Sequence, residues 1–159
     1  MTSRSYIVQS AFLEKIKECD VEGMSRDETI DWEIIHMVSS ARTAYMLAEK
    51  RDVDPDIAAC ACTIHDIGRV VTGVQKGHAE CGYEFAKDFL EILKLFSDEE
   101  IEQIAISVKN HSKKGEIGSP LEEIVKDADM LDMHMYGREL QREEQKQRLA
   151  KLLTVLSEY

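Results

Sequence analysis

The sequence predicts an all-α fold, a single-domain bundle of about six or seven helices. Apolar residues recur at helical spacing along most of the 159-residue chain, and several capping signals mark helix starts. No segment shows the alternation of apolar and polar residues that is typical of a half-buried strand. Neither an internal repeat nor a linker rich in Pro or Gly divides the chain. We therefore expect one domain over residues 1–159.

The first long helix is expected within residues 25–51. Ser25 and Glu28 stand at the spacing of a capping box, and His36 lies inside the segment that follows. The residues at helical intervals in this segment are Ile30, Ile34, Val38, Ala41, Tyr45 and Ala48.

The next helix is expected at residues 54–68. Asp54 is its N-cap, a proline follows at the first helical position, and Gly68 marks its end. Small apolar residues leave this helix with hardly any polar face, so we expect it to run through the core. His65 and Asp66 then fall in its last turn.

Further helices are expected at residues 78–96 and 98–111. The first is amphipathic, and a capping box of Ser97 and Glu100 opens the second. Another helix begins after Ser119, where an N-cap, a proline and a reciprocal glutamate coincide. This last helix carries three acids, Asp127, Asp129 and Asp132.

A C-terminal helix is expected over about residues 138–157, with one apolar stripe formed by Leu149, Leu152, Leu153 and Leu156. We favour docking of this stripe on its own domain. The alternative is a homodimer in which the helix docks on a second copy of the chain.

The formal net charge of -11 disfavours nucleic acid and anionic membranes as partners. Charges interrupt every apolar run before the roughly 18 residues of a membrane span, and the N-terminus lacks a secretory signal. A cytoplasmic location with four reduced cysteines is the resulting expectation. Cys60 and Cys62 lie in an apolar run and are expected in the core.

Four of the five histidines fall within or at the ends of separate predicted helices. They are His36, His65, His78 and His111. Asp66 and Asp129 lie on these helices or a further one, and helical bundles build metal sites from such inward-facing side chains. Imidazole and carboxylate together suit Fe, Mn, Zn, Co or Ni, while the cysteine spacing argues against a zinc finger.

The order of His36, then "HD" at 65 and 66, then Asp129 in "VKDADMLD" resembles the HD superfamily of metal-dependent phosphohydrolases. The match covers about residues 30–135, and "HDIGR" is similar to the commonest form of the short His-Asp sequence motif in that family. The resemblance implies an all-helical HD-domain fold with one metal held by His36, His65, Asp66 and Asp129.

Some members of this superfamily hold a second metal with two more histidines, and diadenosine tetraphosphate hydrolases are among them. His78 in "KGHAECG" and His111 in "SVKNHS" correspond to these, although His78 follows His65 by only 13 residues. The resemblance then implies that Asp66 bridges both ions. One ion or two, and which metal, stay open, with Mg a further candidate.

The resemblance implies an enzyme that cleaves a phosphomonoester or phosphoanhydride of a small molecule, with a nucleotide favoured, by a metal-activated water. Two dications beside Asp66 and Asp129 would leave a formal charge of about +2, which attracts phosphate despite the acidic surface. We expect Arg69 and Lys114 to contact the substrate phosphate.

Two alternatives stay open. One is a non-catalytic HD module that holds metal and senses a nucleotide or binds a partner protein. The other is a helical interaction protein with structural histidines. For an enzyme, specificity is expected from residues 70–77 and 112–119. We expect Asp127 and Asp132 to cap a helix, pair with Lys or face solvent.

Overall fold

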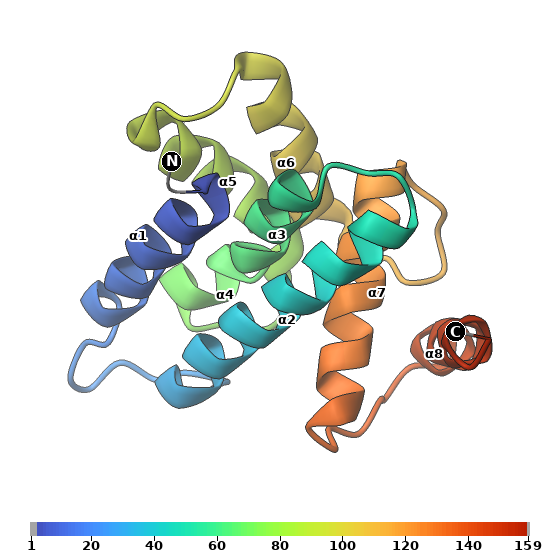
Figure 1. The fold of residues 1–159 in the computed structure, drawn as a ribbon. Helices are drawn as coiled ribbons and strands as arrows, with labels where there is room; N and C mark the ends of the chain where they lie inside the picture. Colours follow the sequence, from blue (N-terminus) through green and yellow to red (C-terminus); the bar gives the residue numbers. More distant parts are fainter. Residues whose placement is uncertain (1–2, 159) are drawn as a thin grey trace.

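The computed structural model describes residues 3–158, which form eight helices and no strand. The predicted all-α class is confirmed (Figure 1). The helices are α1 (Arg4–Glu18), α2 (Ile30–Lys50), α3 (Pro55–Thr63), α4 (Ile67–Thr72), α5 (His78–Leu93), α6 (Asp98–Asn110), α7 (Pro120–Met135) and α8 (Glu143–Leu156).

The central element is α3, which contacts α1, α2, α6 and α7 (Figure 1). Its Asp54 cap and first-turn proline form as expected, and its short apolar side chains allow these neighbours to approach closely. Ala58, Cys60, Ala61 and Cys62 are completely buried, which confirms the expectation that this helix and both cysteines lie in the core.

Two helix starts form as the sequence predicts. The Ser97 hydroxyl accepts a hydrogen bond from the Glu100 backbone N–H, and the Glu100 carboxylate accepts one from the Ser97 N–H. The Ser119 and Glu122 pair makes the same reciprocal arrangement at α7. Each box satisfies backbone donors that the first helical turn leaves without partners.

The start of α2 differs from the prediction of a cap at Ser25. Thr29 is the N-cap, and its hydroxyl accepts from the Trp32 backbone N–H at 3.1 Å. The Glu28 carboxylate instead accepts from the Arg138 guanidinium at 2.7 Å. A long-range ion pair therefore uses the glutamate that the sequence pattern assigned to a capping box.

The helix expected at residues 54–68 is divided in two, which brings the helix count above the expected six or seven. α3 ends at Thr63, and Asp66 occupies the N-cap position of α4. His65 and Asp66 therefore lie in the break between two helices rather than in a last helical turn. This break lets their side chains leave the α3 axis toward the other helices.

Gly68 does not end a helix but lies within α4, where the backbones of α4 and α5 meet. A Cβ atom at this position would lie 2.0 Å from the carbonyl oxygen of His78. The helix ends at Gly73, whose φ of 76° is in the left-handed region that favours glycine.

α8 packs against its own domain, beyond α7 (Figure 1). Leu149 is buried with Met130 and Leu140, and Leu152 belongs to the main core. Among residues 3–158, no helix combines the length and apolar character needed to cross a bilayer.

Candidate metal centre

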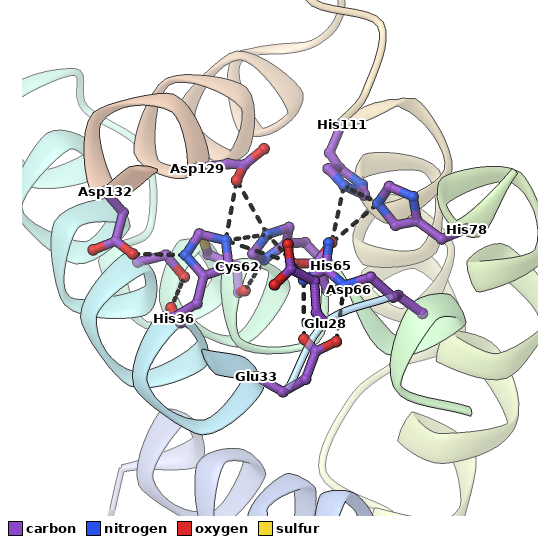
Figure 2. Close-up of polar contacts among 12 residues, drawn as sticks. Glu28, Glu33, His36, Cys62, His65, Asp66, His78, His111, Asp129 and Asp132 are labelled. Carbon is purple, nitrogen blue, oxygen red and sulfur yellow. Dashed lines mark hydrogen bonds and ion pairs between the residues drawn. The ribbon is translucent and has the colours of Figure 1, made fainter. Parts of the chain in front are cut away.

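The structure brings together all six metal ligands expected from the sequence, and none is more than 7% exposed. They come from separate parts of the chain, and Figure 2 shows their side chains converging. His36 lies on α2, His65 and Asp66 between α3 and α4, His78 at the start of α5, His111 at the end of α6, and Asp129 on α7.

Four of these side chains form one half of the cluster. The Nε2 atoms of His36 and His65 are 3.1 Å apart. Asp129 Oδ1 lies 3.1 Å from His36 Nε2 and 3.5 Å from His65 Nε2. Asp66 Oδ2 lies 3.5 and 3.2 Å from the same two nitrogens. His36, His65 and Asp66 lie close enough together to hold one cation, and Asp129 Oδ1 approaches the same two nitrogens.

The other half consists of His78, His111 and the second oxygen of Asp66. The two Nε2 atoms are 3.0 Å apart. Asp66 Oδ1 lies 3.0 Å from His78 Nε2 and 3.4 Å from His111 Nε2. Asp66 therefore stands between the two halves and directs one oxygen to each (Figure 2).

The opposite side of each imidazole faces an acceptor, which fixes the ring. His36 Nδ1 lies 2.6 Å from an Asp132 oxygen, and the other three Nδ1 atoms lie 2.5 to 2.7 Å from backbone carbonyls. An Nδ1–H must donate in each case, so each Nε2 is directed at the centre, where a neutral ring offers its lone pair. These carbonyls belong to Cys62, Gln75 and Val108.

Two unprotonated Nε2 atoms 3.0 or 3.1 Å apart repel one another, and a cation bound by both nitrogens removes this repulsion. The donor set therefore fits divalent metal ions, one in each half. Imidazole nitrogens whose far side donates to a carbonyl or carboxylate are the usual form of a metal-bound histidine. Neutral nitrogen with carboxylate oxygen suits a transition metal such as Mn, Fe, Co, Ni or Zn.

Two buried basic side chains, Arg69 and Lys114, pair with the carboxylates of the expected ligands. Arg69 makes a bidentate pair with Glu33 at 2.8 and 2.9 Å and donates to Asp66 Oδ2 at 2.6 Å. It also donates to the Gln75 side chain at 2.8 Å. Lys114 Nζ lies 2.5 Å from Asp129 Oδ2.

Arg69 and Lys114, expected to contact substrate phosphate, thus lie at the site but contact its acidic ligands. A direct contact with phosphate stays a prediction for both.

The positive charges of Arg69 and Lys114 help to keep Asp66 and Asp129 ionised. Burial opposes ionisation of Asp66, but the charges of Arg69 and His65 and the hydrogen bonds with His111 and His65 together outweigh it and hold the pKa well below its ordinary value. Burial also opposes ionisation of Asp129, but the charge of Lys114 and the hydrogen bonds with His36 and His65 together outweigh it, and the pKa is again well below its ordinary value. Burial lowers the pKa of His111 to about 4, so this imidazole is neutral at pH 7 and available as a ligand.

The first half of the cluster stabilises positive charge. Burial disfavours protonation of His36, but hydrogen bonds with Asp129 and Asp132 outweigh it and raise the pKa. Burial is likewise outweighed at His65, where the charge of Asp66 helps to raise the pKa well above its ordinary value. Carboxylates that attract a proton to this point also attract a metal cation.

Sequence reasoning missed two acids that support the ligands, and it assigned one of them wrongly. Asp132 neither caps nor faces solvent, since it is 2% exposed and bonded to His36. Its position one helical turn after Asp129 was the available signal. Glu33, 3% exposed, holds Arg69 and stands three residues before His36 on α2.

Asp127, which was expected to cap a helix, pair with Lys or face solvent, pairs with Arg51 and Arg148 instead.

The cluster opens into a cleft of about 120 Å³. Gln75 and Ser112 line it, from segments that the sequence marked for specificity. The lining also includes Arg138, Arg142 and Gln145, which were not expected at the site because their segment resembled only a docking helix. A larger cleft of about 380 Å³ lies between α7 and α8, and its lining contains none of the four imidazoles.

The model of the HD domain family matches residues 34–134 of the chain. The crystal structure of a predicted HD superfamily hydrolase from an uncultured Thermotogales bacterium is also similar, with a TM-score of 0.62 and 21% sequence identity. The likeness covers 94% of this chain and 89% of that chain, and it shows a shared fold. No curated protein matches the chain.

Proposed function

The chain belongs to the HD domain family, and from this premise we propose that it is a metal-dependent phosphohydrolase. It cleaves a phosphomonoester or phosphoanhydride of a small molecule, and a nucleotide is the favoured substrate. The observation that carries the proposal is the position of Asp66 between two pairs of inward-facing imidazoles. Such a bridged arrangement suits hydrolysis at phosphorus.

Divalent cations held by the ligands of the two halves would supply Lewis acidity and would lower the pKa of a water near phosphorus. The protein supplies position. Asp66 sets the separation between the two halves, Asp129 completes the first half, and the hydrogen bond from His36 to Asp132 fixes the ring that completes it. Arg69 and Lys114 prevent these carboxylates from turning away or accepting a proton.

Charge favours a phosphorylated substrate over a neutral one. Besides the ligands, the lining of the cleft contains four basic residues, Arg69, Lys114, Arg138 and Arg142. Metal cations at the base of the cleft would add to this local charge, and the field inside the cleft would then oppose that of the acidic surface. The cleft is also far smaller than the roughly 300 Å³ of a typical small-molecule pocket, so it suits a phosphoryl group and leaves the remainder outside.

The test compares wild-type protein loaded with Mn²⁺ with the Asp66→Ala variant on a panel of nucleotides and p-nitrophenyl phosphate. We expect phosphate release by the wild type and a loss of at least about a hundredfold in the variant, because both halves of the cluster lose a ligand. The control is Asp88→Asn, which removes one exposed carboxylate from α5.

Activity that survives in Asp66→Ala contradicts the assignment. Stoichiometric nucleotide binding by the wild type without product after long incubation favours a sensing module instead.

A further inference from the structure

Two arginines of the segment between α7 and α8 line the same cleft as the metal ligands. Arg138 follows the end of α7, and Arg142 immediately precedes α8. Their side chains are 36% and 44% exposed, whereas Arg69 and Lys114 are buried among the ligands. The cleft thus has two groups of basic residues. The buried group contacts the acidic ligands, and the other group is accessible from solvent.

The basic groups differ in how they are neutralised. Arg69 pairs with Asp66 and Glu33, and Lys114 pairs with Asp129. Arg138 pairs with Glu28 at 2.7 Å, which also lines the cleft.

Arg142 is neutralised differently. It donates to the backbone carbonyl of Ser112 at 2.8 Å. Its carboxylate partner is Glu144 at 3.0 Å, which lines the other cleft. Within the described residues, Arg142 is therefore the basic group of this cleft whose charge no acid of the same cleft balances.

Contacts with neighbouring groups hold both arginines in place. The Arg138 guanidinium lies 3.8 Å from the centre of the Trp32 ring, and Trp32 in turn stacks on the ligand His36 with ring centres 4.9 Å apart. Arg142 is fixed by Ser112, the residue after the ligand His111. A guanidinium retains several N–H donors after two such contacts, and its planar fork matches phosphate oxygens.

The small volume of the cleft limits what can lie at its base. At about 120 Å³, it takes the phosphoryl group under attack and leaves the next group of the substrate near the accessible arginines. In a phosphoanhydride this next group is a second phosphate, whereas in a phosphomonoester it is an uncharged carbon.

We infer that Arg142, assisted by Arg138, binds a second phosphate group of the substrate, so that the preferred substrates contain a diphosphate unit rather than a single phosphoester. This inference rests on the proposed phosphohydrolase function and narrows its substrate class. Arg142 and Arg138 are specificity-determining residues in this account, because they contact the group next to the one that is transferred.

The test measures binding rather than turnover. Mn²⁺-loaded wild type, Arg142→Gln and Arg142→Lys are titrated by calorimetry with methylenebisphosphonate and with inorganic phosphate. We expect the wild type to bind the bisphosphonate more tightly than phosphate. Arg142→Gln should weaken bisphosphonate binding at least about tenfold and phosphate binding less than about twofold, since one charged hydrogen-bonding partner is lost. Arg142→Lys should retain part of the preference.

The matched control is Arg42→Gln, which removes one positive charge from an exposed position of α2 and should change neither dissociation constant. Equal weakening of both anions in Arg142→Gln overturns the inference, because it indicates a structural role through Ser112. An unchanged bisphosphonate affinity, or a wild type without preference, overturns it as well. Hydrolysis is scored separately, so absent turnover contradicts the proposed function and leaves this binding result intact.

Discussion

At the scale of single residues, the orientation of four imidazoles is the strongest indication of a metal centre. Each Nδ1 faces an acceptor, and each Nε2 faces the centre. The acceptor of His36 is the Asp132 carboxylate, the one charged acceptor among the four. Such a hydrogen bond fixes the tautomer and makes the ligand nitrogen more basic.

We expect Asp132→Asn to weaken Mn²⁺ binding by about 10- to 100-fold, since an amide cannot accept from His36 as strongly as a carboxylate does. The measurement is a Mn²⁺ titration of the variant beside Asp88→Asn, which makes the same change of charge at an exposed site. Equal affinity in wild type and Asp132→Asn would show that Asp132 only fills space.

The convergence of the six expected ligands could be predicted from sequence because their residue types, order and helical setting resemble a known family. Their supporting acids could not. Glu33 and Asp132 are ordinary acidic residues among many in this chain. The packing of α2 against α7 makes Asp132 a buried partner of His36, and Glu33 becomes buried through its pair with Arg69 of α4. Arg69 was expected at the site from the sequence, but its bidentate pair with Glu33 of α2 follows from the tertiary structure.

At the scale of elements, the break between α3 and α4 places His65 and Asp66. Gly68 then allows α4 to pack directly on the first turn of α5, which carries His78. The sequence identified this glycine but not its role, since a helix end and a close approach of two backbones produce the same signal. The capping boxes were predictable because their hydrogen bonds are local.

We expect Gly68→Ala to destabilise the protein by about 1 to 3 kcal/mol. It should also weaken the half of the cluster that contains His78, because the new methyl group would lie 2.0 Å from the His78 carbonyl oxygen and displace α5. Urea unfolding and metal content measure the two effects.

Gly115→Ala is the control, since its Cβ would meet the nearest atom at an ordinary 3.4 Å. Wild-type stability and metal content in Gly68→Ala would mean that α4 and α5 are not packed this closely.

At the scale of the whole molecule, a net charge of -11 surrounds a cleft with four basic lining residues. The net charge follows from composition, but the presence of arginines from α4 and the α7–α8 segment in one cleft depends on the fold. The ion pairs near the N-terminus likewise depend on the fold, because Arg4 of α1 pairs with Asp56 of α3 and Glu100 of α6.

The Arg4 cluster predicts a pH-dependent stability. Burial opposes ionisation of Asp56, but hydrogen bonds from Ser5 and Arg4 outweigh it and lower the pKa from its ordinary 3.8. The hydrogen bond from Arg4 lowers the pKa of Glu100 from its ordinary 4.5. A lowered pKa means that the contribution to stability is complete above these ordinary values and is lost as pH falls through the lowered ones.

We therefore expect Arg4→Met to reduce the free energy of unfolding by about 1 kcal/mol at pH 7, with the difference from wild type shrinking below about pH 4.5. Urea unfolding of both proteins between pH 7 and pH 3 measures it. A difference that stays constant with pH would assign the effect to packing over Phe96 rather than to charge.

The most direct test of the metal centre counts ions per chain by elemental analysis after loading with Mn²⁺ and desalting. The account predicts two ions in the wild type and one in His111→Ala, because the His36, His65, Asp66 and Asp129 half stays intact. Wild-type protein that retains no metal, or a His111→Ala variant with the same ion count as wild type, would contradict the account.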